Sequence, residues 1–267
     1  MAQYKRIVYF VGAGPGDPKL ITVRGKEVIQ QADVILFDRL VNRELLQYAG
    51  PHTRFIDCGK KPGYSSYSQT KIHQLLVHHA KSGQSVVRLK GGDPGIFGRA
   101  GEEAAYCAQN GIPFEFVPGV TSGTAAPLYA GIPLTHRGTS SSVAFVTGHS
   151  CKGEYGGRDW IGLLKQVETV VVYMGMSHLP IIRKQMILQG CPITTPAAVI
   201  HRGTWEGYQK TLTGTLENIV DKVRQENIQS PAVIVFGEVV HLQKQLAWFP
   251  LEQHDSAKEE ILAQTKV

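Results

Sequence analysis

The segment from 86 to 103 concentrates residue types that can hold a ligand. Its apolar run 86–90 is typical of a buried parallel strand, and the run ends in Gly91 and Gly92. Glycines at such a point let the backbone approach a ligand closely, and Asp93 adds a hydrogen-bond acceptor. The segment therefore predicts a binding site at the end of a strand, although a tight turn with solvated charges fits the same residues when they are taken alone.

A helix is expected directly after this turn. Arg99 and Glu102 are three residues apart, so they would share one face of its first turn. Ala104, Ala105 and Ala108 would belong to its apolar face. The turn would thus present a guanidinium and a carboxylate close to the glycines.

Strands that alternate with helices must position this segment. Apolar runs predict five strands in the first half of the chain, over residues 7–11, 33–37, 54–57, 86–90 and 114–117. A helix capped by Thr22 and reaching about Ala32 is expected between the first two. The alternation is typical of a doubly wound parallel sheet, in which the loops after the strands meet at one edge.

The loop after the first strand resembles a nucleotide-binding turn only in part. A dinucleotide fingerprint reads GxGxxG, and Gly12 and Gly14 match its first two glycines. Asp17 stands in place of the third glycine, and Pro15 interrupts the turn. A nicotinamide enzyme is therefore a weak interpretation, although this loop can still offer backbone groups to a ligand.

Asp38 follows the second predicted strand, at the same edge as the glycine loop. It could accept a proton there, or it could cap the helix predicted over 42–48, and the residue pattern leaves both roles open. The loop 59–67, rich in Gly, Ser, Lys and Tyr, fits either a lid or a solvated connection.

Composition narrows the class of protein. The chain has 267 residues, 42% of them hydrophobic, and a formal net charge of +6 that is dispersed along the sequence. This pattern favours an anionic small molecule over nucleic acid as partner. The four cysteines are far apart and form no CxxC pair, so neither a zinc site nor a disulfide framework is expected. Without a predicted leader or membrane span, the expected location is cytoplasmic, with reduced thiols.

The rhythm of strands and helices breaks near residues 131–139. The sequence therefore predicts an N-terminal α/β domain over 1–137, a C-terminal α/β domain over 138–249 and a charged tail over 250–267, helical near 258–263. Strands of the second domain are expected over 143–149, 196–200, 209–213 and 231–237, with a strand and its loop over 169–176 and a helix over 216–224.

Five motifs in order along the chain resemble one family, the tetrapyrrole methylases. They are Val11-Gly12-Ala13-Gly14-Pro15-Gly16-Asp17, Arg88-Leu89-Lys90-Gly91-Gly92-Asp93-Pro94 with Phe97-Gly98-Arg99, Pro118-Gly119-Val120-Thr121-Ser122, Ala130-Gly131-Ile132-Pro133-Leu134-Thr135-His136-Arg137 and Val172-Tyr173-Met174-Gly175. The resemblance implies a two-domain α/β fold, each domain a mixed or parallel sheet flanked by helices, with the active site in the inter-domain cleft. It also implies S-adenosylmethionine as methyl donor, no metal and a homodimer.

Within that family the motifs are most similar to the members that act on uroporphyrinogen III. This similarity implies two successive carbon methylations that give precorrin-2, a precursor of sirohaem, cobalamin or haem d1. A methylase of a later corrin precursor is the nearest alternative. A diphthine-synthase-like enzyme, an NAD-dependent oxidoreductase and a non-catalytic binding module are more distant ones.

The resemblance also assigns roles to individual residues. It implies Asp38 as proton acceptor, Lys60 as proton donor and Glu102 as a catalytic residue, with the choice of base between Asp38 and Glu102 left open. Arg99 and Arg137 would bind the carboxylate-rich substrate, for which forked guanidinium groups are well suited. The implied cofactor contacts are Pro15, Gly91, Gly92, Asp93, Ile96, Thr121, Ser122, Met174, Gly203 and Ala232. The chain departs from the family at Gly95, where a bulky residue is usual, and at Ala100, where glycine is common.

Overall fold

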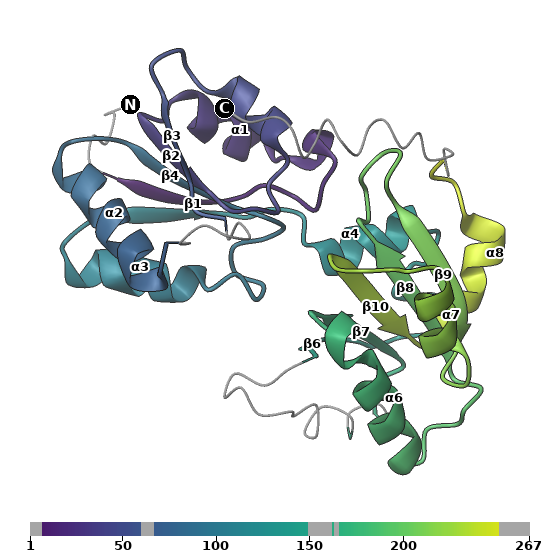
Figure 1. The fold of residues 1–267 in the computed structure, drawn as a ribbon. Helices are drawn as coiled ribbons and strands as arrows, with labels where there is room; N and C mark the ends of the chain where they lie inside the picture. The colour runs from purple at the N-terminus through teal and green to yellow at the C-terminus, as the bar shows by residue number, and fades with distance from the viewer. Residues whose placement is uncertain (1–6, 60–66, 149–161, 163–165, 251–267) are drawn as a thin grey trace. The chain divides into compact units, whose positions relative to one another are not determined.

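A computed structural model describes residues 7–59, 67–148, 162 and 166–250 (Figure 1). The chain divides into two compact units, the first ending at Ala125 and the second beginning at Ala126. The domain limits expected from the sequence, near residue 137, stay a prediction. The helix expected in the tail lies outside the described residues.

The first unit is built on a parallel sheet, as the alternating pattern predicted. Its five strands have the order β3-β2-β4-β1-β5, and all four pairings are parallel. Their bounds are β1 (Val8–Gly12), β2 (Val34–Phe37), β3 (Arg54–Asp57), β4 (Val86–Lys90) and β5 (Phe114–Val117). The central strands β2 and β4 are buried along their whole length, as expected for strands covered on both faces.

Helices cover both faces of this sheet. They are α1 (Val23–Gln30), the 3₁₀ helix η2 (Arg43–Tyr48), α2 (Gln69–Lys81) and α3 (Ala100–Gln109), and α4 (Ser122–Tyr129) follows β5. Hydroxyl caps begin two of them, because the side chains of Thr22 and Ser68 accept hydrogen bonds from the amides of Gly25 and Lys71. The predicted N-cap at Thr22 is thus confirmed.

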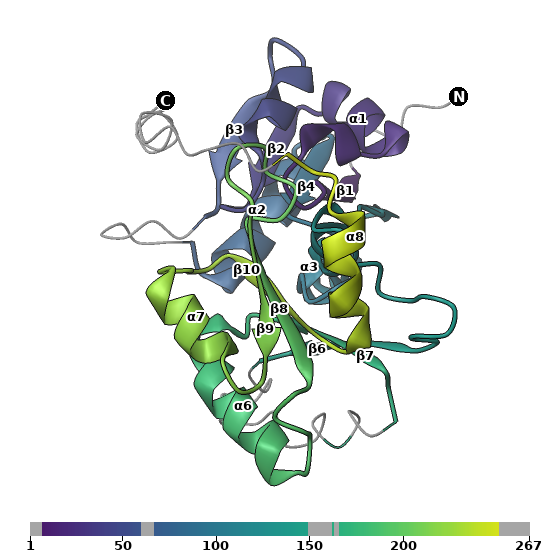
Figure 2. The same ribbon diagram turned by 90° about the vertical axis from the view of Figure 1, so that its right-hand side faces the viewer.

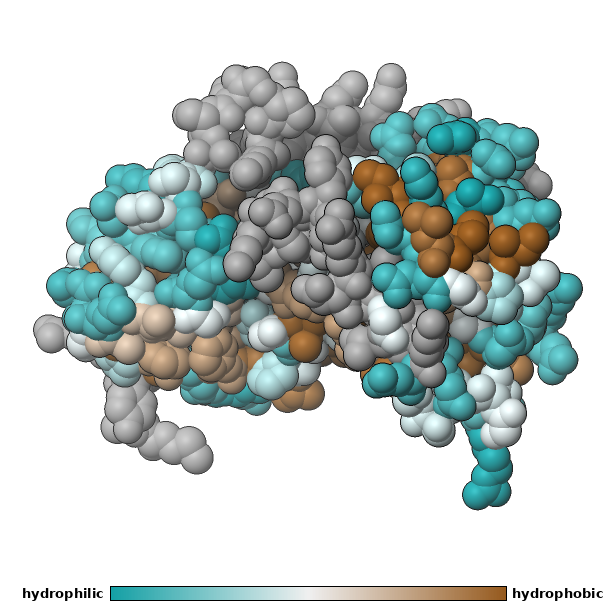
Figure 3. Space-filling model, turned by 90° about the horizontal axis from the view of Figure 1, so that it is seen from below, coloured by the Kyte–Doolittle hydropathy of each residue, from teal (hydrophilic) through white to brown (hydrophobic). Residues whose placement is uncertain are grey.

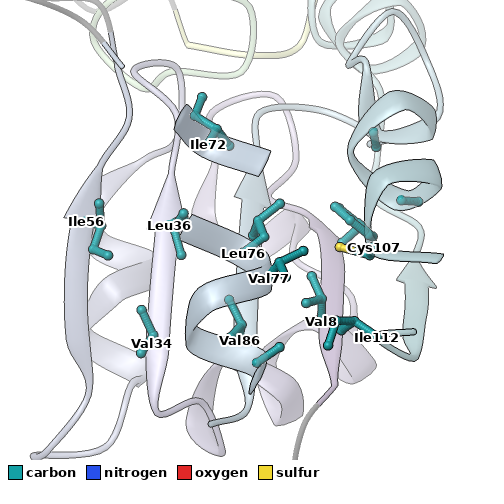
Figure 4. Close-up of a cluster of buried hydrophobic side chains, with 14 of the residues drawn as sticks. Val8, Val34, Leu36, Ile56, Ile72, Leu76, Val77, Val86, Cys107 and Ile112 are labelled. Atoms are coloured by element: carbon teal, nitrogen blue, oxygen red, sulfur yellow. The ribbon is translucent and has the colours of Figure 1, made fainter. Parts of the chain in front are cut away.

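Two hydrophobic layers hold the helices to the sheet. In the first layer α2 and α3 pack on one face, where Ile72, Leu76 and Cys107 belong to one buried cluster with Val8 and Leu36 (Figure 4). In the second layer α1 and η2 pack on the opposite face. The helices after the neighbouring strands β1 and β4 therefore lie on opposite faces. In open α/β sheets, ligands bind at the carboxyl edge of the strands where the loops diverge in this way.

The predicted apolar face of α3 is partly wrong. Ala104 is buried, but Ala105 and Ala108 are exposed, and Glu103 occupies the buried face instead. A carboxylate can take this place because two cations of β4 neutralise it inside the unit.

The second unit contains a mixed sheet of five strands in the order β6-β7-β10-β8-β9 (Figure 2). The strands are β6 (Val143–Thr147), β7 (Thr169–Tyr173), β8 (Pro196–His201), β9 (Lys210–Thr215) and β10 (Ala232–Phe236). Only β6 and β7 pair in parallel; the other pairings are antiparallel. Both sheets fall within the predicted fold class of mixed or parallel sheets flanked by helices.

Helices also cover both faces of the second sheet. The helices α6 (Leu179–Leu188) and α7 (Ile219–Gln225) pack on one face. The 3₁₀ helix η5 (Glu238–Leu242) and residues at the end of α4 pack on the other, and the short helix α8 (Gln243–Leu246) follows η5.

On the face that Figure 3 shows, polar residues are interspersed with apolar ones, and the apolar ones gather in patches. The exposed apolar residues of the second unit include Ile181, Leu188 and Ile193. Among the described helices, none has the length and apolar character needed to cross a membrane.

Candidate functional site

The parallel register brings the candidate residues of the first unit to one sheet edge. Gly12 pairs with Lys90, Phe37 with Leu89, and Val11 with Val117, so these strands end together. The loops after them carry eight of the predicted site residues, Pro15, Asp38, Gly91, Gly92, Asp93, Ile96, Arg99 and Thr121, and Ser122 begins α4. The sequence-based expectation that these loops meet is confirmed.

Close contacts between glycines lock three of these loops together. The amide of Gly92 donates to the carbonyl of Gly14 at 2.7 Å, and the amide of Gly14 donates back at 3.2 Å. A Cβ atom on Gly12 would lie 2.5 Å from the Cα of Gly119 and 2.7 Å from the carbonyl oxygen of Gly92. Glycine is therefore required at Gly12 and Gly119 for packing as well as for any ligand, and the loops form one backbone surface.

Asp93 connects two of the loops through its carboxylate. Its Oδ2 accepts a 2.9 Å hydrogen bond from the amide of Gly119, and its Oδ1 accepts a 2.7 Å hydrogen bond from the amide of Gly95. The side chain thus fixes the turn after β4 against the loop after β5. Its predicted contact with a cofactor stays a prediction.

A buried ionic network lies beneath this edge, and the sequence analysis missed it. Glu103 is completely buried, with Oε2 3.2 Å from Arg88 Nε and Oε1 3.1 Å from Lys90 Nζ. Arg88 Nη2 lies 2.5 Å from Asp38 Oδ1, and Lys90 Nζ lies 3.6 Å from Asp38 Oδ2. Gln69 on α2 donates to Glu103 Oε1 at 2.9 Å. Two cations and two carboxylates from three elements therefore balance each other.

A sequence signal for the network does exist. Arg88 and Lys90 alternate along an apolar strand, so both side chains point to the same face of the sheet. Buried cations require paired anions, which predicts carboxylates on the elements packed against that face. Glu103, in register with the buried residues Ala100 and Cys107 of α3, satisfies this requirement.

The network affects the pKa values of Arg88, which belongs to it, and of Cys58, which lies nearby. Burial tends to lower the pKa of Arg88, but Asp38 and Glu103 outweigh burial, so this pKa stays above its ordinary value. Burial also raises the pKa of the nearby Cys58 thiol to about 11, although Arg88 opposes the shift. Arg88 is thus a permanent cation, and Cys58 is a neutral thiol.

The capping role considered for Asp38 is wrong. Asn42 caps η2, because its Oδ1 accepts a 3.0 Å hydrogen bond from the amide of Glu44. Asn42 also donates to the carbonyl of Gly16 at 2.8 Å, which ties the loop after β2 to the loop after β1. Asp38 is left to the ionic network, with 32% of its side chain exposed.

Arg99 and Glu102 form the pair that their spacing predicted. Two parallel hydrogen bonds of 2.9 and 2.8 Å join Nε and Nη2 of Arg99 to the two oxygens of Glu102. Hydrogen bonding to Arg99 lowers the pKa of Glu102, and the same bond raises the pKa of Arg99. Both side chains are exposed. The arrangement presents a charged fork at the start of α3.

The second unit carries four further predicted residues: Arg137, Met174, Gly203 and Ala232. Arg137 is exposed in the turn between His136 and Ser140, whose backbones pair at 2.9 Å. Met174 follows β7 with 48% of its surface exposed, and Ala232 begins β10. Lys60, the predicted proton donor, lies outside the described residues.

Gly203 has a structural explanation that the sequence did not reveal. A Cβ atom there would collide with the methyl group of Ala126 on α4. Its neighbours Arg202 and Thr204 adopt left-handed conformations, with φ of 43° and 74°. The glycine thus permits a close approach between a sharp turn and a helix, while its predicted cofactor contact stays a prediction.

Left-handed backbone conformations of residues other than glycine gather near the predicted site residues. Phe97 and Arg99 have φ of 54° and 58°, and Met174 has φ of 51°. Such conformations are unfavourable for these residue types and recur at functional sites. They coincide with the segments that the motifs singled out.

The residues present fit S-adenosylmethionine. Backbone groups at Gly91 and the hydroxyls of Thr121 and Ser122 can hydrogen bond to ribose and amino-acid groups, and Gly92, bonded to Gly14, lets the backbone approach a ligand closely. The exposed side chain of Ile96 offers apolar surface to a base. Within the described residues, no cluster of His, Cys, Asp or Glu side chains is arranged to hold a metal ion.

Comparisons with known proteins agree with this fold and this set of residues. The family of tetrapyrrole (corrin/porphyrin) methylases matches residues 7–220, and the chain belongs to that family. It is 53% identical over 234 residues to the uroporphyrinogen-III C-methyltransferase of Priestia megaterium, a match covering 88% of this chain and 98% of that protein. It is 52% identical to the enzyme of the same name from Bacillus subtilis, over 91% of this chain and 50% of that protein.

A solved structure supports the same assignment. The crystal structure of the uroporphyrin-III C-methyltransferase of Thermus thermophilus in complex with S-adenosylhomocysteine matches with a TM-score of 0.75 and 38% identity. The match covers 88% of this chain and 99% of that one. The chain thus spans nearly the full length of two of these relatives and about half of the B. subtilis protein.

Proposed function

We propose that this protein is an S-adenosylmethionine-dependent C-methyltransferase that methylates uroporphyrinogen III twice to give precorrin-2. The observation that carries the proposal is the 53% identity with a uroporphyrinogen-III C-methyltransferase along nearly its whole length. The glycine edge of the first unit and the paired Arg99 and Glu102 supply the chemistry that such an enzyme needs.

The cofactor residues are proposed in both units. The loops after β1, β4 and β5 offer Pro15, Gly91, Gly92, Asp93, Ile96, Thr121 and Ser122, and the second unit offers Met174, Gly203 and Ala232. When bound, S-adenosylmethionine supplies a methyl group activated by a positively charged sulfur. The protein therefore needs only to align a macrocycle carbon with that methyl group.

The charged residues bind and deprotonate the macrocycle in this proposal. Arg99 and Arg137 hold substrate carboxylates, and Glu102 keeps the guanidinium of Arg99 oriented. After the new carbon–carbon bond forms, a proton must leave the macrocycle, and a carboxylate accepts it. Lys60 is the proposed donor for any proton that must be returned.

The geometry favours Asp38 over Glu102 as the proton acceptor. Both oxygens of Glu102 are held by Arg99, and its lowered pKa makes it a weaker base. Asp38 binds Arg88 through Oδ1, whereas Oδ2 lies 3.6 Å from Lys90, beyond hydrogen-bond distance. Lys90 therefore does not hold Oδ2 by a hydrogen bond, whereas Arg99 holds both oxygens of Glu102.

The proposal extends to a cytoplasmic homodimer, as the family resemblance implies. Light scattering after size-exclusion chromatography tests the dimer. Which product pathway follows, to sirohaem, cobalamin or haem d1, depends on the enzymes that act next.

The test is an anaerobic incubation of the protein with S-adenosylmethionine and uroporphyrinogen III, followed by product mass and absorbance. The expected result is a gain of two methyl groups. Asp38→Asn is expected to lower kcat by about 10²-fold or more, and Arg137→Gln to raise KM for the macrocycle. A protein that binds S-adenosylhomocysteine but adds no methyl group would contradict this substrate and favour a later corrin precursor.

A further inference from the structure

The buried charges beneath Asp38 form a closed arrangement. Each cation lies between the two carboxylates: Arg88 contacts Asp38 and Glu103 at 2.5 and 3.2 Å, and Lys90 approaches the same two at 3.6 and 3.1 Å. The elements involved are β4, α3 and the residue after β2. A displacement of any member therefore moves the others.

Exposure within this arrangement is very unequal. The side chains of Arg88, Lys90 and Glu103 are 2%, 4% and 0% exposed, whereas Asp38 is 32% exposed. Among the four, Asp38 alone presents its charge to the sheet edge where the glycine loops meet. The three buried groups are thus the support of the one accessible carboxylate.

Stability alone is a poor reason for such a network. Replacing a buried set of ion pairs by apolar side chains of similar volume is often neutral or stabilising. Here two of the three buried members are instead oriented by further bonds: Gln69 donates to Glu103, and Arg88 Nη1 lies 3.4 Å from the carbonyl of Leu36 on β2. These additional bonds fix the orientation of the buried side chains, which pairing of opposite charges alone would not do.

We propose that Glu103 is a positioning residue that fixes the carboxylate of Asp38 through Arg88 and Lys90. The inference rests on the proposed function, because it assumes that Asp38 accepts the proton. Glu103 shares the two cations with Asp38 and so prevents both from closing on Asp38, which leaves Asp38 Oδ2 available. Its side chain is completely buried and bonds to Arg88, Lys90 and Gln69.

The experiment is a double-mutant cycle on methyl transfer to uroporphyrinogen III by the full chain. Glu103→Gln keeps the side chain's shape and removes its charge; it is expected to lower kcat by about tenfold to a hundredfold. The Kd for S-adenosylhomocysteine, measured by calorimetry, is expected to stay within about twofold, because the glycine loops are untouched. Glu115→Gln, the same change at an exposed ion pair with Arg24, is the matched control and should leave kcat unchanged.

The decisive comparison uses the Asp38→Asn background. If Glu103 acts through Asp38, adding Glu103→Gln to Asp38→Asn lowers kcat no further, whereas an independent role in folding gives multiplying losses. Gln69→Ala removes one bond to Glu103 without unburying a charge and should lower kcat by about threefold. If Glu103→Gln does not fold, the cycle of Gln69→Ala with Asp38→Asn decides in its place.

The two possible failures are distinct. An active wild type with multiplying losses overturns the positioning role and leaves the proposed function intact. A folded wild type that transfers no methyl group overturns the proposed function, and the inference falls with it.

Discussion

Strands β4 and β7 are both buried along their whole length, yet they are chemically different. β4 carries the cations Arg88 and Lys90, whereas the polar residue of β7 is Thr169, whose hydroxyl bonds to Ser140 at 2.8 Å. The cations of β4 are neutralised by carboxylates of neighbouring elements, whereas the hydroxyl of Thr169 in β7 is satisfied by one hydrogen bond. The first unit thus carries buried charge that leads to a surface carboxylate, while the second supplies an apolar frame for its loops.

The largest expected effect follows from breaking the charge balance of the first unit. Arg88→Met leaves the buried Glu103 and the partly exposed Asp38 with one cation and should lower the free energy of unfolding by about 3–5 kcal/mol. Ile234→Val, in the central strand β10 of the second unit, should cost only about 0.5–1.5 kcal/mol. Urea unfolding followed by circular dichroism measures both.

Fluorescence separates the two units in that experiment. Among the described residues the tryptophans are Trp205 and Trp248, and both belong to the second unit, so their emission follows its unfolding. Arg88→Met should shift the circular dichroism transition more than the fluorescence transition. A smaller loss for Arg88→Met than for Ile234→Val would contradict the importance of the ion network.

The next largest difference between the two units is expected in the reactivity of their cysteine thiols. Burial raises the pKa of both Cys58 and Cys107 in the first unit to about 11, while Cys191 in the second unit is only half-buried. At pH 8 a thiol with that pKa is about one-thousandth ionised, against roughly a quarter for an ordinary thiol. Cys58 and Cys107 should react with a maleimide at least about a hundredfold more slowly than Cys191, as measured by peptide mass spectrometry. Equal rates in the folded protein would refute this burial.

Glycine contacts offer a smaller, matched comparison. A Cβ atom on Gly12 or on Gly148 would lie 2.5 Å from the Cα of a glycine in the adjacent loop, Gly119 or Gly175. Gly12→Ala and Gly148→Ala should each cost about 1–3 kcal/mol by overpacking, read as a lowered Tm. Gly101→Ala is the control, because a Cβ atom there meets no atom within 4 Å and alanine favours its helix.

The smallest effect compares two exposed carboxylates. Arg99 lowers the pKa of Glu102, whereas the backbone amide and hydroxyl of Ser141 lower the pKa of Glu168. Since both pKa values are lowered in the folded state, the associated stability is present at neutral pH and is lost as pH falls through each folded pKa. In about 1 M salt the pKa of Glu102 should rise towards its ordinary value and that of Glu168 should not, because salt screens ion pairs between side chains. Carbon-13 NMR titration measures both, and parallel responses would contradict the assignment of causes.

The sequence was sufficient to predict strands such as β2, β7 and β10 because they are apolar runs bounded by turn residues. It could not show that α3 buries Glu103, because helical periodicity treats a carboxylate as an exposed residue unless its partners are known. The same limitation left the role of Asp38 open: its main partner, Arg88, is fifty positions away in the sequence and adjacent only through the pairing of β2 with β4.

The candidate site likewise has features that the sequence could predict and features that only the folded chain shows. Spacing was enough for the pair Arg99 and Glu102, which lie within one helical turn. Gly203 was assigned to a ligand, whereas its contact with Ala126 shows a packing requirement that only the folded chain reveals. The antiparallel pairing of β8, β9 and β10 likewise depends on chain reversals that apolar runs alone do not specify.

The close contacts between glycines also determine which positions of this site tolerate a substitution. Gly12 and Gly119 leave no room for a side chain, so a mutation at either position must be accommodated by several loops at once. Gly95 meets only a carboxylate oxygen of Asp93, and Gly101 meets nothing within 4 Å. Diversification or directed evolution of ligand preference can therefore begin at Gly95 and Gly101, whereas Gly98 between them, whose Cβ atom would lie 2.7 Å from the carbonyl oxygen of Pro94, has to stay glycine.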